Sequence, residues 1–366
     1  MKNILITTLF IITLASGVSY SLSIHPADKH AKPVKNIILM IGDGMGTAQI
    51  YSGYTANKGK LNLERFPVCG FSVTWCTSHF VTDSGAGGTA IATGYKTYSG
   101  AIGVDSGGQP VKTILEWAEE KGKATGLVAT CAITHATPAS FISHEASRND
   151  YEPIARDFLD TPIDVFVGGG RDHFEKRADS INLSSEFIKR GYRVAYTLEE
   201  IKNTRRGPLA GLLAPVHPAK WSEGRGDQLP ESVRESLRLL SDDKDGFFLM
   251  VEGSQIDWAA HANDAKYLVE EMIDFDKAIG IALDFAQQNG ETLVIVTADH
   301  ETGGLTIPGG NLSTGEVTAT FSTKDHSGVM VPVFTYGPHA SEFGGIQQNT
   351  DLFNKMIIAF GFTGTK

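Results

Sequence analysis

Asn36-Ile37-Ile38-Leu39-Met40-Ile41 is the stretch that best indicates how this chain folds, and Gly42-Asp43-Gly44 follows it. Its apolar residues run without alternation, which is typical of a parallel strand buried on both faces. Similar apolar runs occupy 124–130, 165–167, 247–251, 292–297 and 331–336. Helical patterns lie between several of them, at 111–121, 231–240 and 265–289. This order predicts an α/β fold with a mostly parallel central sheet flanked by helices on both faces.

Two long polar stretches interrupt this order, at 171–246 and 303–330. Both are rich in glycine, and the first also contains proline clusters. We expect them to be small surface insertions that cross the edge of the sheet, and not separate domains. A chain in which 41% of the residues are hydrophobic can build a large core, so we predict a single domain over 34–366.

The first residues have the pattern of a secretory signal peptide. Met1-Lys2-Asn3 is a short positive region, residues 4–18 are apolar, and small residues follow. We predict a signal peptide over 1–21, a flexible polar arm over 22–33, and export of the mature chain to the periplasm or the medium. An uncleaved membrane anchor is the alternative, but the apolar run is shorter than the roughly 20 residues of a full span.

The charge and the cysteine content argue against several classes of protein. A net charge of −10 speaks against a role in coating nucleic acid. It leaves an anionic substrate possible, because carboxylates that hold a cation count as negative until the cation binds. The cysteines are Cys69, Cys76 and Cys131. The first two lie too far apart along one extended segment to pair, and the lack of a Cys-x-x-Cys motif argues against zinc–thiolate chemistry.

Polar side chains of the kind that bind metals follow five of the predicted strands. They are Asp43 after the first strand, the stretch from His135 to Thr137, the stretch from Glu252 to Asp257, the pair Asp299-His300, and His339 after the last strand. An aspartate after a strand is a common turn residue, but five such strand ends are hard to explain as turns. Because ligands bind outside the carboxyl ends of strands in open α/β sheets, we expect these side chains to share one edge.

A serine stands in the stretch Thr82-Asp83-Ser84-Gly85-Ala86-Gly87-Gly88-Thr89-Ala90, which continues into an apolar helical pattern. At the start of a helix, Ser84 would meet free N–H groups and the positive end of the helix dipole. That position suits a nucleophile that works on a negatively charged group. A glycine-rich turn without chemistry is the alternative interpretation of this segment.

Carboxylates and imidazoles are numerous enough here for more than one metal ion. Asp257 and His261 are four residues apart in a helical pattern, so they share one face of the helix. Sets of carboxylate and imidazole ligands suit zinc, whereas sets of carboxylate and hydroxyl ligands suit magnesium. The sequence therefore predicts a multinuclear metal centre.

These segments closely resemble those of the alkaline phosphatases. The matching segments, in family order, are 41–44, 81–86, 134–139, 251–257, 297–304 and 336–339. Together they span most of the chain from residue 36 onward, and as a set they are specific, although each alone is weak. The resemblance implies an alkaline phosphatase-like catalytic domain over 34–366.

The resemblance also implies a role for each site residue. Ser84 would be the nucleophile that accepts the phosphoryl group, Arg148 would bind two phosphate oxygens, and Asp83 would orient Arg148. One zinc ion would be held by Asp257, His261 and His339, a second zinc ion by Asp43, Asp299 and His300, and a magnesium ion by Asp43, Thr137 and Glu252.

Two positions vary within the family and stand near the phosphate or the third ion. His135 replaces an aspartate of some members, and we expect it either to draw a softer metal or to weaken magnesium binding. Trp258 replaces a lysine or histidine, so phosphate would bind less tightly; neutral effects of both are the alternative. Several other residues are expected to be surface, capping or packing residues: His79, His144, His173, His217, His326, Asp274 and Asp276.

The implied function is the hydrolysis of phosphate monoesters at alkaline pH through a phosphoserine, with two zinc ions and one magnesium ion per chain. The family pattern also implies a homodimer. Two alternatives stay open: a phosphodiesterase of the same superfamily, and an exported protein that binds metal or phosphate without catalysis. The retention of Arg148, Thr137 and Glu252 argues against the first, and the retention of Ser84 argues against the second.

Overall fold

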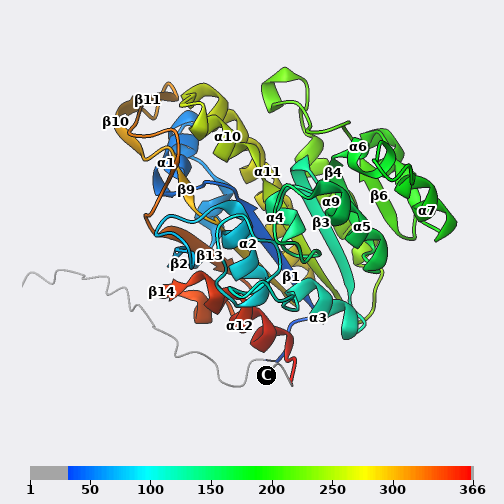
Figure 1. Cartoon of the computed structure of the whole chain (residues 1–366). Coiled ribbons are helices and arrows are strands. Elements are labelled where there is room, and N and C mark those ends of the chain that lie inside the picture. The colour runs from blue at the N-terminus through cyan, green and yellow to red at the C-terminus, as the bar shows by residue number, and fades with distance from the viewer. Residues whose placement is uncertain (1–31, 364–366) are drawn as a thin grey trace, which may run out of the picture.

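The computed structural model describes residues 32–363 (Figure 1). The predicted signal peptide and most of the predicted arm lie outside the described residues. The centre of the molecule is a ten-stranded sheet with the strand order β14-β2-β13-β8-β1-β7-β3-β4-β6-β5. Its strands are β1 (Asn36–Gly42), β2 (Val68–Val73), β3 (Ala124–Ala132), β4 (Val165–Gly169), β5 (Arg193–Ala195), β6 (Leu209–Leu212), β7 (Phe247–Gly253), β8 (Thr292–Thr297), β13 (Val331–Tyr336) and β14 (Gly345–Gln348).

The remaining elements surround this sheet. Two small sheets pair β10 (Leu305–Asn311) with β11 (Glu316–Phe321), and β9 (Glu301–Thr302) with β12 (His326–Ser327). The helices are α1 (Thr47–Ala56), α2 (Ser84–Thr93), α3 (Ile114–Glu120), α4 (Ala136–Ala139), α5 (Tyr151–Asp160), α6 (Arg171–Glu175), α7 (Leu183–Lys189), α8 (Leu198–Lys202), α9 (Gln228–Leu240), α10 (Gln255–His261), α11 (Ala265–Asn289) and α12 (Asn349–Phe360). Short 3₁₀ helices lie at η1 (Asn62–Arg65), η2 (Trp221–Glu223) and η3 (Ala340–Phe343).

One strand of the ten-stranded sheet runs against the others. β1 pairs in parallel with β7 and β8, and β3 pairs in parallel with β4 and β7. β13 is antiparallel to both of its neighbours, β8 and β2. The start of β13 therefore lies beside the carboxyl end of β8, and its end lies beside the start of β8. This reversal matters for the candidate site.

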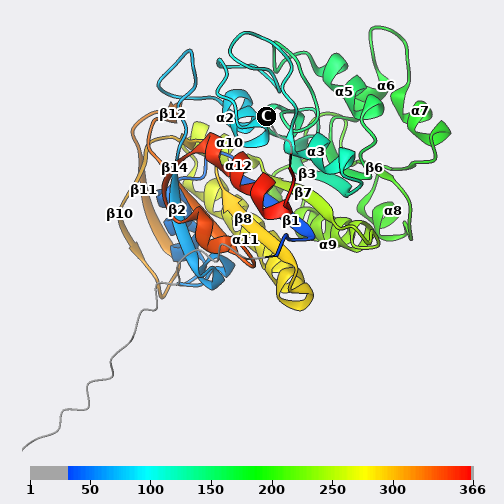
Figure 2. The same cartoon turned by 90° about the horizontal axis from the view of Figure 1, so that it is seen from below.

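Helices cover both faces of the sheet (Figure 2). The alternate residues Ile37, Leu39 and Ile41 of β1 pack in one hydrophobic cluster with residues of α2, α3, α5 and α12. Ile38 and Met40 pack in the opposite cluster with α9 and α11. Burial on both faces explains why β1 is apolar at every position, and the predicted fold class is confirmed.

The predicted elements agree closely with the observed ones in the core of the sheet. β8, β13 and α11 begin and end at the predicted residues, and β1, β3, β4 and β7 extend one or two residues beyond the prediction. The stretch 171–246 is more than a surface insertion, because β5 and β6 extend the sheet beyond β4. These two strands have three and four residues, too few for a periodic pattern. The stretch 303–330 contains the β10–β11 hairpin.

Asp274 and Asp276 are buried, so the expectation of a surface position is wrong for both. Asp276 accepts hydrogen bonds from the backbone N–H groups of Asn62 and Leu63 and so fixes η1 against α11. Asp274 pairs with Arg225 at 2.8 Å, which joins α11 to the loop after η2. Both carboxylates thus have structural partners on other segments.

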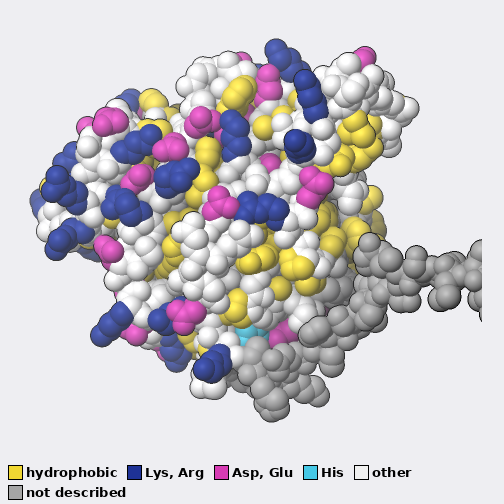
Figure 3. All heavy atoms as spheres, turned by 180° about the vertical axis from the view of Figure 1, so that it is seen from behind, with side chains coloured by type: hydrophobic (Ala, Val, Ile, Leu, Met, Phe, Trp, Pro, Cys, Tyr) yellow, Lys and Arg dark blue, Asp and Glu magenta, His cyan; other side chains and the backbone are white. Residues whose placement is uncertain are grey.

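The surface of the domain carries both signs of charge. On the face opposite to that of Figure 1, Lys and Arg side chains are interspersed with Asp and Glu (Figure 3). Within residues 32–363, no helix combines the length and the apolar character that crossing a bilayer requires.

Candidate active site

Ser84 is the first residue of α2, and all of α2 is buried. Asp83 caps this helix by accepting a hydrogen bond from the Ala86 N–H at 3.1 Å. The small residues of α2 allow it to approach its neighbours closely, since a Cβ on Gly87 would lie 3.0 Å from the Asp299 carbonyl oxygen. Ser84 is therefore presented at a helix N-terminus, where free N–H groups and the helix dipole favour an anion.

The Ser84 hydroxyl points at a cluster formed by the ends of β1 and β8. Its Oγ lies 3.2 Å from His300 Nε2 and 3.5 Å from Asp43 Oδ2. His300 Nε2 also lies 3.4 Å from Asp43 Oδ1 and 3.4 Å from Asp299 Oδ2, and all three side chains are fully buried. Neither of those two carboxylate oxygens has a hydrogen-bond partner.

This first cluster has the electrostatics of a cation site. Burial raises the pKa of Asp43 well above its usual value, and the neighbouring carboxylates Asp299, Asp257 and Glu252 raise it further. Burial and Asp257 likewise raise the pKa of Asp299 to about 6. Buried carboxylates crowded together are costly unless they are protonated or share a positive charge, which a divalent ion would provide.

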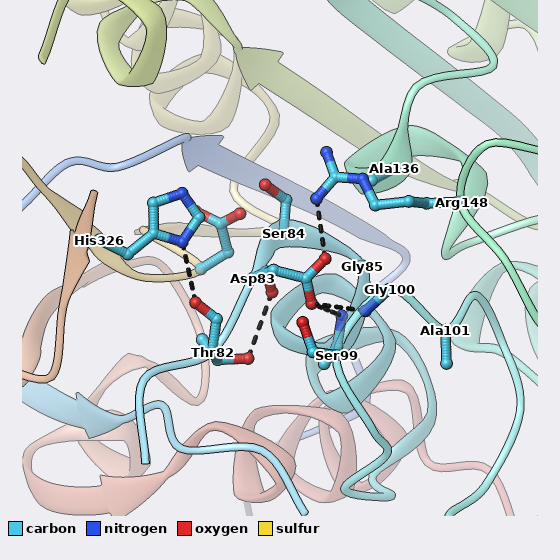
Figure 4. A network of polar contacts seen from close by, with 12 residues as sticks. Thr82, Asp83, Ser84, Gly85, Ser99, Gly100, Ala101, Ala136, Arg148 and His326 are labelled. Atoms are coloured by element: carbon cyan, nitrogen blue, oxygen red, sulfur yellow. Dashed lines mark hydrogen bonds and ion pairs between the residues drawn. The ribbon is translucent and has the colours of Figure 1, made fainter. Parts of the chain in front are cut away.

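A second cluster joins α10 to β12. Asp257 Oδ1 lies 3.3 Å from His261 Nε2 and 3.6 Å from His326 Nε2, and the two imidazole nitrogens are 3.2 Å apart. His326 donates from Nδ1 to the Thr82 carbonyl oxygen at 2.8 Å, and His261 donates from Nδ1 to the Lys324 carbonyl oxygen (Figure 4 shows the former). A metal-binding histidine commonly donates its other ring N–H in this way, which leaves Nε2 free.

The structure does not place His339 in this cluster, so that expectation is wrong. His339 follows β13, whose antiparallel direction puts its carboxyl end at the opposite edge of the sheet. There His339 Nδ1 lies 2.7 Å from Glu342 Oε1, and Nε2 lies 3.2 Å from the Lys32 carbonyl oxygen. His326, which was expected to be a surface or packing residue, precedes β13 and occupies the place predicted for His339. Its position just before an apolar strand is a signal that points to it, once the strand is known to run antiparallel.

A third group lies between the ends of β3 and β7. Cys131, His135 and Glu252 each offer a ligand atom, and these atoms lie within 4.8 Å of one another. Glu252 and Thr137 are fully buried, and Glu252 Oε1 and Thr137 Oγ1 have no hydrogen-bond partner. Burial raises the pKa of Glu252 to about 7. Cys131 was not singled out as a site residue from the sequence, since no motif contains it.

Arg148 is held over the start of α2 by Asp83 (Figure 4). Arg148 Nη1 donates to Asp83 Oδ2 at 2.8 Å, while Asp83 Oδ1 accepts from the Gly100 N–H at 2.9 Å. Burial alone would raise the pKa of Asp83, but Arg148 and the backbone donors outweigh it and lower the pKa. Asp83 therefore stays ionised and fixes the guanidinium beside Ser84.

His135 and Trp258 meet at the other side of Arg148. Arg148 Nη2 lies 3.4 Å from His135 Nε2, and the ring centres of His135 and Trp258 are 5.9 Å apart. His217, expected to be a surface or packing residue, packs its ring 4.7 Å from Trp258 and accepts a hydrogen bond from the Ala132 N–H at 3.0 Å. The loop before η2 thus contributes a ring to the wall of the site.

The chain is similar to known proteins over nearly its whole length. A family model described as alkaline phosphatase matches residues 34–320. Alkaline phosphatase 4 of Bacillus subtilis is 34% identical, and the match covers 97% of this chain and 96% of that protein. Alkaline phosphatase 3 of the same organism is 42% identical, with 81% of this chain and 67% of that protein covered.

A solved structure of an alkaline phosphatase from the Antarctic bacterium TAB5 has a similar fold. The TM-score is 0.86 at 40% sequence identity, and the match covers 91% of this chain and 100% of that one. The agreement therefore extends over nearly all of the chain. With sequence and fold in agreement over this length, the chain belongs to the alkaline phosphatase family.

Proposed function

We propose that the protein hydrolyses phosphate monoesters at alkaline pH through a phosphoserine formed on Ser84. Membership of the alkaline phosphatase family supports phosphomonoester hydrolysis as the activity. The observation that carries the choice of nucleophile is the position of the Ser84 hydroxyl. It lies at the N-terminus of α2, with His300 and Asp43 on one side and the Asp83–Arg148 pair beside it.

The side chains fit the metal ions that the family pattern implies. Asp43 Oδ1, Asp299 Oδ2 and Glu252 Oε1 are buried oxygens without hydrogen-bond partners. We propose that one zinc ion is held by Asp257, His261 and His326, a second zinc ion by Asp43, Asp299 and His300, and a third ion by Asp43, Thr137 and Glu252. Magnesium as the third ion is supported by a variant of the TAB5 alkaline phosphatase that binds magnesium in a site called M3.

The protein's own groups can position each step of the reaction. When bound, the ions supply positive charge that stabilises phosphoryl transfer and favours the ionised form of attacking hydroxyl groups. Arg148 binds two phosphate oxygens with its planar fork, and Asp83 holds that fork in place. Ser84 Oγ loses its proton to solvent and bonds to phosphorus as the ester P–O bond breaks, and the leaving alcohol oxygen takes up a proton from water. A water molecule then attacks the phosphoserine, which restores the Ser84 hydroxyl and releases inorganic phosphate.

Hydrolysis of p-nitrophenyl phosphate tests this proposal directly. The purified chain is measured at alkaline pH before and after chelation, and again after zinc and magnesium are returned. We expect activity to be lost and restored in the parent, and Ser84→Ala to lower kcat by more than about 10³-fold. Ser184→Ala is the matched control, because Ser184 is also a buried helical serine but lies in α7.

A metal-loaded parent without activity would overturn the proposal. Hydrolysis of bis-p-nitrophenyl phosphate in preference to the monoester would identify a phosphodiesterase. Binding of inorganic phosphate without turnover of either substrate would identify a scavenger.

We further propose that the protein is exported and forms a homodimer. Export is supported by the signal-peptide pattern of residues 1–21, and N-terminal sequencing of the secreted chain tests it. A mature chain that begins near residue 22 is the expected result. Light scattering of the purified chain tests the dimer, and a monomer at micromolar concentration would contradict it.

A further inference from the structure

Arg148 ends a loop over residues 143–148, the Arg148 loop, which is bonded to a second loop over residues 100–104, the Gly100 loop. The Arg148 N–H donates to the Gly100 carbonyl oxygen at 2.7 Å, and the Gly100 N–H donates to Asp83 Oδ1 at 2.9 Å. Asp83 Oδ2 in turn accepts from Arg148 Nη1, so the three residues form a closed set of contacts (Figure 4). A residue that holds the two loops together therefore acts on the position of the guanidinium.

His144 is such a residue, and it also joins the two loops to a helix. Its Nδ1 lies 2.6 Å from the Gly103 carbonyl oxygen, and its Nε2 lies 3.0 Å from Glu116 Oε1. Glu116 belongs to α3, which packs in the hydrophobic core, and its Oε2 accepts from the Thr113 N–H at 2.8 Å. His144 thus links the Arg148 loop and the Gly100 loop to an element that the core holds in place.

Both ring nitrogens of His144 face oxygen atoms that carry no proton. Burial alone would raise the pKa of Glu116, but the hydrogen bonds from His144 and from the Thr113 N–H outweigh it and lower the pKa, so this carboxylate is ionised. A neutral imidazole has one N–H and one lone pair, so it can donate to only one of the two oxygens. His144 therefore makes both contacts at once only when it carries two protons.

The charges around His144 favour this doubly protonated form. Glu116 faces it from α3, Asp157 faces it from α5, and Glu145 follows it in the chain. Burial lowers the pKa of His144, but the hydrogen bonds to Glu116 and to the Gly103 carbonyl oxygen outweigh burial and raise the pKa above its usual value of 6.5. The two contacts are therefore complete below that pH, and one of them is lost as the pH rises through the raised pKa of the folded chain.

We propose that His144 is a positioning residue for Arg148, and that it fastens the Arg148 loop through both ring nitrogens only in its doubly protonated form. The inference rests on the proposed function, in which Arg148 binds two phosphate oxygens. Loss of the proton breaks one of the two contacts, so the guanidinium is held less firmly and inorganic phosphate binds more weakly at alkaline pH. Weaker binding of the product favours its release under the conditions in which the enzyme is proposed to work.

Binding of inorganic phosphate to the metal-loaded full chain tests this without relying on turnover. Titration calorimetry measures the Kd at pH 6 and at pH 10, and each variant is compared with the parent at the same pH, so that the ionisation of phosphate cancels. His144→Gln keeps a donor for Glu116 at both pH values but loses the contact with Gly103. We expect its Kd to exceed that of the parent by about 3- to 30-fold at pH 6 and to equal it at pH 10. A ratio of the two Kd values that is the same at both pH values overturns the proposal.

Glu116→Gln makes the opposite change, and a folding defect cannot imitate its expected result. The glutamine amide can donate to the Nε2 lone pair of a neutral His144, whose Nδ1 then donates to the Gly103 carbonyl oxygen. The glutamine oxygen still accepts from the Thr113 N–H, so the N-terminal cap of α3 is kept. Both contacts then persist at pH 10, and we expect the Kd for phosphate there to be about threefold or more below that of the parent. A folded variant whose Kd at pH 10 is unchanged or higher overturns the proposal.

His339 provides the matched control, because its two ring nitrogens also face oxygens, those of Glu342 and Lys32, at the opposite edge of the sheet. We expect His339→Gln to leave the Kd for phosphate unchanged at both pH values, and the same pH-dependent loss in this variant would refute the link to Arg148. Hydrolysis of p-nitrophenyl phosphate by the parent reports on the proposed function separately. An active parent with a constant ratio of Kd values refutes this inference alone, whereas phosphate binding without turnover refutes the proposed function alone.

Discussion

The two ends of β13 each carry a histidine, and the two side chains have opposite environments. Before the strand, His326 donates from Nδ1 to the Thr82 carbonyl oxygen, and its Nε2 faces Asp257 and His261. After the strand, His339 has both ring nitrogens beside oxygens, those of Glu342 and Lys32. An imidazole binds a metal through a nitrogen that carries no proton. Only His326 presents such a nitrogen to other metal-type ligands.

The difference shows how strand direction decides which residues reach the site. The carboxyl ends of β1, β3, β7 and β8 meet at one edge, where crowded carboxylates lack partners. At the opposite edge, polar groups pair locally, as His339 and Glu342 do. Because β13 is reversed, the residue that precedes it belongs to the first edge and the residue that follows it belongs to the second.

Replacing each of the two histidines in turn by alanine should give the largest difference in kcat/KM. We expect His326→Ala to lower kcat/KM by at least about 100-fold, because it removes a proposed zinc ligand, and to lower the zinc content of the chain. His339→Ala removes a side chain at the far edge and should leave kcat/KM within about twofold, as for a remote substitution. The measurements are p-nitrophenyl phosphate kinetics and zinc analysis of both variants.

The reverse result would contradict the roles given to the two histidines. If His339→Ala lost zinc and activity while His326→Ala kept both, the direction of β13 or the assignment of the first site would be wrong. Replacement of His326 by Gln should leave the fold intact and still lose zinc, which separates loss of a ligand from loss of folding.

The sequence was sufficient to predict which edge of the sheet carries the site, but not every residue that lies there. Apolar runs predicted β8 and β13 to the residue, because both strands are mostly buried and largely apolar. Nothing in the run 331–336 reports its direction, since a strand has the same apolar pattern whether it pairs in parallel or antiparallel. The assumption that it runs in parallel, together with the family resemblance, made His339 the expected ligand, while His326 was expected to be a surface or packing residue.

Residues that reach the site from outside the motifs could not be predicted from the sequence either. Cys131 faces Glu252 only because β3 and β7 pair in register, and His217 reaches Trp258 only because a loop returns over the sheet. The short strand β6 that carries this loop has four residues and no recognisable period. Long apolar strands and local spacing are readable from sequence, whereas contacts between distant short segments are not.

A substitution of Asp83 tests the edge of the sheet that carries the proposed active site. Asp83→Asn keeps a side chain able to cap α2 but removes the charge that holds Arg148. We expect kcat/KM to fall about 10- to 100-fold and inhibition by phosphate to weaken, because a charge-assisted hydrogen bond contributes about 1.5–3 kcal/mol. Kinetics with inorganic phosphate as inhibitor check this.

Asp105 provides the matched control. Its Oδ1 accepts hydrogen bonds from the Gly107 and Gln109 N–H groups in a turn and touches no proposed site residue. Asp105→Asn makes the same chemical change and should leave kcat/KM unchanged. An equal loss of activity in both variants would mean that the effect of Asp83→Asn comes from the fold and not from Arg148.

The substitution of Glu119 should give the smallest effect, and this effect is on stability. Glu119 lies at the opposite edge of the sheet, where β3 begins, and unlike the polar groups described above it has a strongly shifted pKa. Burial raises its pKa to about 8, and Asp164 adds to the shift, although a hydrogen bond from Thr125 opposes it. The folded chain therefore keeps this proton between about pH 4.5 and 8, while the unfolded chain loses it, so the free energy of unfolding falls as the pH rises through that window.

Glu119→Gln removes this pH-dependent contribution to the free energy of unfolding. We expect it to match the parent at pH 4 and to exceed it at pH 9 by on the order of 1 kcal/mol, a value reduced for solvent screening. Urea unfolding at the two pH values measures the difference. Glu291→Gln alters an exposed carboxylate at the same edge, and this control should not gain stability over the parent at pH 9. If Glu119→Gln also behaved in this way, the folded chain would not hold the proton on Glu119.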